Sequence, residues 1–402
     1  MSESIGEHQL DNGENPEESG ELTIKQEYQL WRKNCRYMYE FVSETALTWP
    51  SLSIQWLPEY TTTDGIIDAK LLIGTNTSGE DKNYLKVATT QLPENSEVKV
   101  SSRLKIVQKF ENNAEICRAR YMPQQSNVVA TINGVGEVDL YDLNHESKQA
   151  ISHNATHSEN GYGLAWSNFT KGYLLTGADD KFSCITDTNT NKVIFKSDVQ
   201  QDIVNDVKWH NFDENLFASV SEDSHVYVFD IRTKEVVSRF YAKESNGINT
   251  LAFSPFSRNL FSIGNTNSNI NLLDMRKLSN DAKSTSGLLH TMMGHGDPIT
   301  SMEFDPHHDG ILATGAQDRR VIIWDLSKIG EEQQQEDAED GCPELFMMHA
   351  GHTGSVTDLN WCPFKPWTLG TVADDNIVHL WEVGKNLLNT EENSEIAASE
   401  LE

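Results

Sequence analysis

Ile323-Trp324-Asp325 ends an apolar, β-branched run, and five further runs along the chain end in a similar way. The other endings are Leu140-Tyr141-Asp142, Ile185-Thr186-Asp187, Val228-Phe229-Asp230, Leu272-Leu273-Asp274 and Leu380-Trp381-Glu382. Successive terminal acids lie 45, 43, 44, 51 and 57 residues apart. A period of about 40–45 residues is typical of WD repeats, in which four short strands form one blade. Because one blade cannot bury both of its faces, the blades stack in a ring.

A second position repeats with the same period. Seven residues before the terminal acid stand Asp180, Asp223, Asp318 and Asp375, with Asn267 in one unit. A side-chain oxygen at a tight turn accepts hydrogen bonds from nearby backbone N–H groups, which explains the repetition. The runs before these turns alternate with a period of two residues, as half-buried strands do. The pattern is clear in four units and weaker in the first and fourth.

Six units leave the ring one blade short of the commonest size. The segment from Leu47 to Leu92 contains three more strand-like runs, namely Leu52–Leu57, Ile67–Ile73 and Tyr84–Leu92. We expect it to complete a seventh blade, its first strand pairing with strands from the C-terminal end, so that the ring has no exposed edge. The predicted fold is all-β: a seven-bladed WD-repeat β-propeller over 44–384, an N-terminal helix over 24–43, an acidic insertion over 329–348, and acidic tails over 1–23 and 385–402.

Composition narrows the class of protein. The chain has 402 residues, 37% of them hydrophobic, and no Pro/Gly/Ser-rich linker divides it. It shows no signal-like opening and no apolar run of the roughly 18 residues that span a bilayer. Its five cysteines are dispersed without CxxC spacing, which favours reduced thiols. We therefore expect a protein of the nucleus and cytoplasm without membrane association.

The net charge of −29 is concentrated in three segments. Residues 1–27 carry eight acids against Lys25, residues 331–344 carry seven acids and no base, and residues 391–402 carry five acids and no base. No basic stripe is visible, so direct nucleic-acid binding is not expected. A basic protein partner fits this charge distribution. For the two tails, a purely solvating role is the alternative.

The predicted helix and the insertion both carry apolar surface. Thr23 and Gln26 form a capping box at the helix start. One stripe (Ile24, Tyr28, Trp31, Cys35, Met38 and Val42) is expected to dock on the propeller, and a second consists of Leu30, Tyr37 and Phe41. The second stripe is either partner contact or core. The acidic insertion ends in the apolar run 345–348, which either forms a shelf for an amphipathic basic helix or begins the next blade's outer strand.

The sequence offers no catalytic or metal-binding constellation. His349 and His352 form an H-x-x-H pattern, but no Glu is placed as in the metalloprotease helix, and a histidine at the start of a blade is the better interpretation. No nucleophile, base and orienting group can be assembled from the sequence. We therefore expect no catalytic residues, no metal and no cofactor.

Longer motifs carry a family resemblance. They include Glu27-Tyr28-Gln29-Leu30-Trp31-Arg32-Lys33-Asn34, Leu47-Thr48-Trp49-Pro50-Ser51-Leu52, Arg118-Ala119-Arg120-Tyr121-Met122-Pro123 and His349-Ala350-Gly351-His352-Thr353. Across residues 24–384 the chain resembles the retinoblastoma-binding family of WD-repeat histone chaperones. Lys208-Trp209-His210-Asn211-Phe212 and the overall brevity look most like the fungal accessory subunit of the type B histone acetyltransferase; the small subunit of a chromatin assembly factor is the close alternative.

The resemblance implies two histone sites. The first helix of histone H4 would lie between the N-terminal helix and the insertion. Its apolar walls would be Leu30, Tyr37, Met38, Phe41, Met347 and Met348, and its acids Glu336, Asp337 and Asp340. Where the family usually ends the insertion with two prolines, this chain has Cys342-Pro343.

The second implied site takes the N-terminal tail of histone H3 at one end of the channel. It would use Glu115, Tyr162, Asn205 and Asn249. Asn160, Asn205, Gly247 and Pro298 stand where many members of the family carry Glu, so tail binding is expected to be weaker.

The function implied is that of a non-catalytic scaffold. It would present histones H3 and H4 to the catalytic subunit of a histone acetyltransferase, as a monomeric subunit of a hetero-complex. A chromatin-assembly subunit is the first alternative. A generic WD adaptor is the second, but a generic propeller needs neither the helix nor the acidic insertion.

Overall fold

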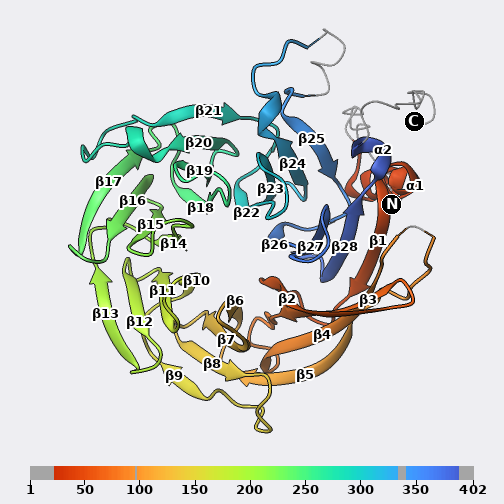
Figure 1. Ribbon diagram of the computed structural model, residues 1–402, viewed down its shortest axis with the longest axis horizontal. Helices are drawn as coiled ribbons and strands as arrows, with labels where there is room; N and C mark the ends of the chain where they lie inside the picture. The colour runs from red at the N-terminus through yellow and green to blue at the C-terminus, as the bar shows by residue number, and fades with distance from the viewer. Residues whose placement is uncertain (1–21, 96, 334–340, 389–402) are drawn as a thin grey trace, which may run out of the picture.

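A computed structural model describes residues 22–95, 97–333 and 341–388. Seven four-stranded antiparallel sheets are arranged in a ring, as predicted (Figure 1). The first blade consists of β2 (Ile54–Thr63), β3 (Ile66–Ile73), β4 (Asn83–Pro93) and β5 (Lys105–Asn112). The second consists of β6 (Ile116–Met122), β7 (Gln125–Asn133), β8 (Val138–Asp142) and β9 (Ser152–Asn154). The third consists of β10 (Gly161–Trp166), β11 (Tyr173–Ala178), β12 (Ser183–Asp187) and β13 (Lys192–Ser197).

The next three blades follow the same plan. The fourth consists of β14 (Val204–Trp209), β15 (Leu216–Ser221), β16 (His225–Asp230) and β17 (Glu235–Tyr241). The fifth consists of β18 (Ile248–Phe253), β19 (Leu260–Asn265), β20 (Ile270–Asp274) and β21 (Leu288–Met292). The sixth consists of β22 (Ile299–Phe304), β23 (Ile311–Ala316), β24 (Val321–Asp325) and β25 (Leu345–His349). Short 3-10 turns follow β20 (Met275–Lys277) and β24 (Leu326–Lys328). Each of the repeated acidic endings lies in the third strand of its blade.

The seventh blade joins the two ends of the chain. It consists of β26 (Val356–Trp361), β27 (Thr368–Ala373), β28 (Ile377–Val383) and, as the outer strand, β1 (Tyr39–Ala46). β1 pairs with β28 in antiparallel register, with Val42 opposite Trp381. Closure by the N-terminal part of the chain was predicted, but the predicted strand was wrong: β2 to β5 form a complete blade of their own, and the closing strand precedes them.

The N-terminal helix is correspondingly shorter than predicted. α1 spans Ile24–Met38 rather than 24–43, because the backbone turns extended at Tyr39. The predicted capping box is present, with the Thr23 hydroxyl accepting from the backbone N–H of Gln26. A second, four-residue helix, α2 (Lys385–Leu388), follows β28. No helix in these described segments is long and apolar enough to cross a membrane.

The repeated turn acids have the predicted role. Asp318, for example, accepts hydrogen bonds from the backbone N–H groups of Gly296 and Arg320 at 2.9 Å each, and its carboxylate also meets Nδ1 of His295 at 2.9 Å. The other ring nitrogen of His295 lies 2.8 Å from the Thr314 hydroxyl, to which the Trp324 indole donates. This network ties the start, the second strand and the third strand of one blade together. The histidines at blade starts are therefore structural.

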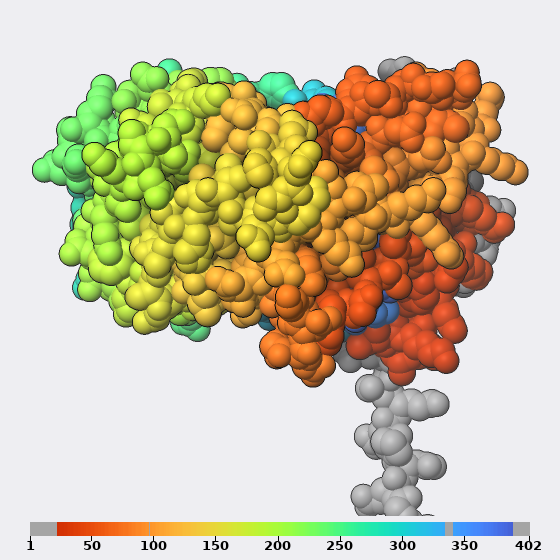
Figure 2. All heavy atoms as spheres, turned by 90° about the horizontal axis from the view of Figure 1, so that it is seen from below, coloured from red at the N-terminus to blue at the C-terminus, as the bar shows by residue number. Residues whose placement is uncertain are grey.

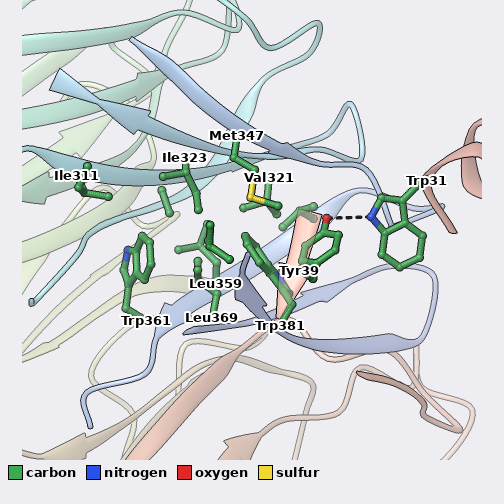
Figure 3. Close-up of a cluster of buried hydrophobic side chains, with 13 residues drawn as sticks. Trp31, Tyr39, Ile311, Val321, Ile323, Met347, Leu359, Trp361, Leu369 and Trp381 are labelled. Carbon is green, nitrogen blue, oxygen red and sulfur yellow. Dashed lines mark hydrogen bonds between the residues drawn. The ribbon is translucent and has the colours of Figure 1, made fainter. Parts of the chain in front are cut away.

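The core is divided between neighbouring blades rather than centred in the ring. One cluster joins the sixth and seventh blades and includes Ile323, Met347, Trp361 and Trp381 (Figure 3). At its outer end lies Trp31 of α1, whose indole nitrogen points at the Tyr39 hydroxyl. Viewed along the plane of the ring, the red and orange N-terminal residues gather at one end of the molecule (Figure 2). The helix is thus attached where the ring closes.

Candidate functional site

α1 is fastened to the propeller by one face. The Trp31 side chain is 5% exposed, and its indole N–H donates to the Tyr39 hydroxyl at 2.9 Å. A Cβ atom built on Gly351 would lie 2.6 Å from the Trp31 ring, so the ring needs a glycine there. The Tyr28 hydroxyl donates to Glu44 at 2.7 Å. The predicted docking stripe is therefore confirmed for Tyr28 and Trp31, which pack against the cluster of the closing blade with Cys35 and Met38.

An ion pair fixes the first turn of α1 to the sixth blade. The Glu27 carboxylate lies 2.9 Å from Nη2 of Arg319 and 3.1 Å from Nη2 of Arg320, both in the turn between β23 and β24. Partial burial raises the pKa of Glu27, but the two guanidinium groups outweigh it and hold the pKa below its ordinary value. The helix thus bridges two blades, the sixth through Glu27 and the seventh through Trp31.

The bond from Trp31 to Tyr39 continues into a buried chain of hydrogen bonds. The Tyr39 hydroxyl is 2.8 Å from Nδ1 of His349, and Nε2 of His349 is 3.1 Å from Nδ1 of His379. Nε2 of His379 has no hydrogen-bond partner among the described residues, and the nearest carboxylate oxygen, of Glu44, is 3.9 Å away. Burial holds the pKa of His349 and His379 well below the ordinary value, and the neighbouring His352 acts in the same direction. Both imidazoles are therefore neutral under ordinary conditions.

The residues predicted to contact the H4 helix fall into different environments. Leu30 is 38% exposed, and half-buried Tyr37 carries the Arg36 guanidinium 4.4 Å above its ring. Met38 packs partly against the closing-blade cluster. Phe41 lies in β1, not on the helix, and packs partly against the core between the seventh and first blades. The second predicted stripe is thus split, with Leu30 and Tyr37 on the helix and Phe41 beside the core.

The apolar run after the insertion is the outer strand β25, which was the alternative interpretation. Met347 is 3% exposed and belongs to the core, so its side chain is not the accessible apolar wall that the resemblance implied. Met348 points to the other face of β25 and is half-buried, whereas Phe346, where the pairing with β24 is irregular, packs against the same cluster as Met347. Met348, like Ile329 and Cys342 from the two ends of the insertion, packs against the core between the fifth and sixth blades. The predicted acids Glu336, Asp337 and Asp340 lie outside the described residues.

The second predicted site surrounds a cavity of about 260 Å³ at one end of the channel. Tyr162, Asn205 and Asn249 line it, together with Cys117 and Gln317. Both asparagine amides donate to the next blade, Asn205 to the carbonyl of Ile248 at 3.0 Å and Asn249 to that of Ile299 at 2.8 Å. Their NH₂ groups are therefore already engaged, which leaves Tyr162, 38% exposed, as the accessible group.

Glu115 of the same predicted site lies against Gly134. A Cβ atom at Gly134 would meet the Glu115 carboxylate at 2.1 Å, so the glycine makes room for this side chain. The Gly134 N–H also donates to the Glu115 carbonyl at 3.0 Å. Glu115 acts electrostatically on Cys117 and Tyr162, both of which line the cavity. The structure therefore brings Glu115 and Tyr162 together.

Sequence reasoning missed acids at this end of the channel. Asp179 follows β11, and Glu222 and Asp374 follow the corresponding strands β15 and β27. Burial raises the pKa of Asp179, and repulsion from Glu159 and Glu222 raises it further. Among the residues that the structure describes, one of its carboxylate oxygens is buried without a hydrogen-bond partner. A signal in the sequence could have found them, because each of these acids directly precedes one of the repeated turn acids Asp180, Asp223 and Asp375. They supply carboxylates at an end of the channel where, by the resemblance, this chain lacks the glutamates that many members of the family carry.

Comparison with known proteins places the chain in a family. Residues 26–94, which include most of α1, match the model described as histone-binding protein RBBP4 or a component of the CAF1 complex. The chain is 65% identical over 398 residues to histone acetyltransferase type B subunit 2 of Debaryomyces hansenii, covering 95% of this chain and 96% of that protein. It is 70% identical over 381 residues to the Candida albicans protein of the same name, covering 95% and 98%. The chain belongs to this family of type B subunit 2 proteins.

More distant members of the family confirm the assignment. The Candida glabrata histone acetyltransferase type B subunit 2 is 42% identical over 386 residues, covering 91% of this chain and 90% of that protein. The model described as WD domain, G-beta repeat matches residues 192–230, 286–325 and 344–382. Each match includes the outer strand of one blade and ends in the third strand of the next. The sequence repeat is thus offset by one strand from the blade. The same offset explains the ring closure, in which the outer strand of the seventh blade is β1 from the other end of the chain.

Proposed function

We propose that the chain is the non-catalytic, histone-binding subunit of a type B histone acetyltransferase. In this proposal the first helix of histone H4 lies beside α1 and the insertion, and the N-terminal tail of histone H3 enters the channel end at Tyr162. The chain presents both histones to a separate catalytic subunit. We propose that the chain binds and presents histones in the nucleus and cytoplasm. Microscopy of a fluorescent fusion tests this location.

The observation that carries the proposal is the attachment of α1. One face is committed to the propeller through Glu27, Tyr28 and Trp31. The helix and the residues just before it also present apolar side chains outward, with Leu22 51%, Ile24 46% and Leu30 38% exposed. An amphipathic partner helix buries such side chains. The family model that includes "histone-binding" in its description matches from Gln26, within this helix.

The acid-rich channel end supports the second histone contact. Asp179 and Glu115 act electrostatically on Tyr162, Glu222 acts on Asp179, and Asp179 has a buried oxygen without a partner among the described residues. Carboxylates of this kind accept charge-assisted hydrogen bonds from Lys and Arg. A basic tail peptide therefore suits this end of the channel.

The test of the H4 site uses the acidic insertion. Asp337→Lys with Asp340→Lys is expected to abolish binding of an H4 first-helix peptide, because attraction to arginines becomes repulsion. The matched control is Glu214→Lys with Glu235→Lys, the same charge change at two exposed acids of the fourth blade. Calorimetry at two ionic strengths measures both peptides, since exposed ion pairs weaken at high salt.

The outcomes separate a local effect from a global one. The double variant should still bind an H3-tail peptide, whose site is at the channel end. Equal loss of both peptides would mean a general defect, and unchanged H4 affinity would remove the insertion from the site.

A reconstitution tests the role in acetylation. The purified chain is expected to transfer no acetyl group by itself and to raise the activity of a catalytic partner on H4. The stimulation should disappear with a short H4 tail peptide that lacks the first helix. Acetyl transfer by the isolated chain would refute the non-catalytic assignment.

Two alternatives remain testable in one experiment. The family model also names the CAF1 complex in its description, so a chromatin-assembly role is the second candidate. A tagged pull-down with mass spectrometry distinguishes them by the large partner protein recovered. Recovery of neither complex, with a ubiquitin ligase instead, would favour a generic WD adaptor.

A further inference from the structure

A second cavity lies in the channel, at the end opposite Tyr162. It has a volume of about 270 Å³ and is lined near the ends of the inner strands by Trp209, Phe253 and Phe304. The Tyr162 cavity is lined instead near the beginnings of the same strands, at Asn205, Asn249 and Thr300. Arg118 lines both cavities, so it marks the boundary between them.

The second cavity gathers cations in a strongly acidic protein. Arg118, Arg120 and Lys208 all line it, although the chain as a whole has a net charge of −29. Both arginines are paired with one buried acid, Asp358, at 3.2 Å from Nη1 of Arg118 and 3.0 Å from Nη2 of Arg120. This leaves Lys208 as the third cation.

Among the described residues, Lys208 has one long ion pair and no hydrogen bond from its ammonium group. The nearest acid to its Nζ atom is Asp206, whose Oδ1 is 3.7 Å away, beyond hydrogen-bonding distance. The Asp206 carboxylate is occupied by Thr250 at 3.0 Å and by the backbone N–H of its neighbour Val207 at 2.9 Å. The Lys208 side chain is 26% exposed, against 1% for Asp206, and it lines the cavity. Burial lowers the pKa of its ammonium group, and the nearby Arg118 and Arg120 act in the same direction, so a bound anion would offset this unfavourable environment. The N–H groups of Lys208 are therefore available to donate hydrogen bonds to a bound anion.

The two carboxylates that line the cavity are by contrast occupied. Asp358 accepts from both arginines, from the Ser301 hydroxyl and from the Ile54 N–H at 2.9 Å. The two oxygens of Glu303 accept from the Asn360 amide at 3.0 and 2.9 Å and from the Trp361 N–H.

A neutral donor supplements Lys208. The Gln55 side-chain oxygen accepts from the Tyr121 N–H at 2.8 Å, which fixes the amide, and within the described segments its NH₂ group has no hydrogen-bond partner. The cavity therefore has donors without hydrogen-bond partners among the described residues, while its two carboxylates, Asp358 and Glu303, are already paired; such a lining suits an acceptor-rich anion.

We infer that this cavity binds a small oxyanion, a phosphate or a carboxylate, held by the ammonium group of Lys208 and the amide of Gln55. The inference is independent of histone binding, because it concerns the opposite end of the channel. Phosphate and carboxylate share the chemistry recognised here, so the experiment measures inorganic phosphate and acetate separately, with chloride at equal ionic strength as the blank.

Glu303 gives the site a characteristic pH dependence. Burial raises the pKa of its carboxyl group to about 7, although Arg120 and Lys208 face it and act in the opposite direction. Below that pH the carboxyl group is neutral and leaves the cations in excess; above it a carboxylate repels a bound anion. Acetate, whose own charge is constant in this range, should therefore bind more weakly as the pH rises through 7.

The experiment uses the full chain and its variants in calorimetry and thermal shift. Lys208→Met should lower oxyanion affinity roughly tenfold or more, as for loss of a charge-assisted hydrogen bond, while Lys208→Arg should retain binding. Lys70→Met, an exposed lysine of the first blade, is the matched control and should leave affinity unchanged. Glu303→Gln should raise affinity at pH 8 and weaken the pH dependence of acetate binding around pH 7.

The outcomes decide the inference. A preference for phosphate over acetate, or for acetate over phosphate, identifies the class of oxyanion. Binding of either anion supports the site if Lys208→Met weakens that binding as predicted. Equal affinity in the parent protein and in a folded Lys208→Met variant overturns it, as does absence of binding by the parent at millimolar phosphate and acetate. A Lys208→Met variant that fails to fold leaves the decision to Glu303→Gln: affinity at pH 8 no higher than that of the parent overturns the site.

Discussion

Replacing Trp31 by Ala is expected to detach α1 while the propeller stays folded. The indole is 5% exposed, and a buried tryptophan removes roughly 150–250 Å² from water. At about 25 cal/mol per Å² this contributes about 4–6 kcal/mol, in line with the roughly 3–5 kcal/mol usually measured for Trp→Ala. The bond to Tyr39 at 2.9 Å is part of that loss.

The remaining polar contacts of α1 are individually weak, and its other apolar residues Tyr28, Cys35 and Met38 are only partly buried. The Glu27 ion pairs with Arg319 and Arg320 are partly exposed and contribute about 0.2–1 kcal/mol each. The hydrogen bond from Tyr28 to Glu44 adds about 1 kcal/mol. A detached helix of 15 residues is itself marginal in water, so it should unfold once it leaves the propeller.

Hydrogen exchange read by mass spectrometry measures this directly. Residues 24–38 should lose protection in Trp31→Ala, the strands should keep theirs, and H4-peptide binding should fall with the helix. Leu30→Ala is the matched control on the same helix, because Leu30 is 38% exposed and should leave protection unchanged. Full protection of residues 24–38 in Trp31→Ala would show that α1 is held by contacts other than those described.

Three further predictions concern the closing blade. Met347→Ala should lower the free energy of unfolding by about 2–5 kcal/mol, the usual cost of a core cavity, and denaturant titration checks it; a neutral result would contradict the burial of this side chain. Tyr39→Phe removes the hydroxyl between Trp31 and His349 and should cost about 1–3 kcal/mol, seen as a lower melting temperature. Because the pKa values of His349 and His379 are depressed in the folded state, their contribution is complete above the unfolded value of 6.5 and is lost as the pH falls below it, by up to about 1.4 kcal/mol per pH unit for each. Unfolding titrations at pH 7 and 5 measure that slope, which should shrink in His379→Phe.

The sequence predicted the ring well because its signal repeats. Acids at turns and at third-strand ends recur in most blades, so an error in one unit does not change the architecture. The end of α1 had no such support. Val42 lies four residues after Met38 and packs against the same core cluster, so a strand residue continued the helical stripe by coincidence. Met347 was misplaced for a different reason, since strand alternation, which buries it together with His349, was outweighed by the acidic context of the insertion.

The position of the closing strand has a consequence for synthesis on the ribosome. β1 ends at Ala46, yet its partner β28 begins only at Ile377. At the usual roughly 5–20 residues per second, β1 would wait on the order of 20–70 seconds before its partner is made. During that time a strand edge and the attachment of α1 are both incomplete, and unpaired edges invite association with other chains. The newly made N-terminal segment is therefore the part of this protein most in need of a protecting factor until the last blade emerges.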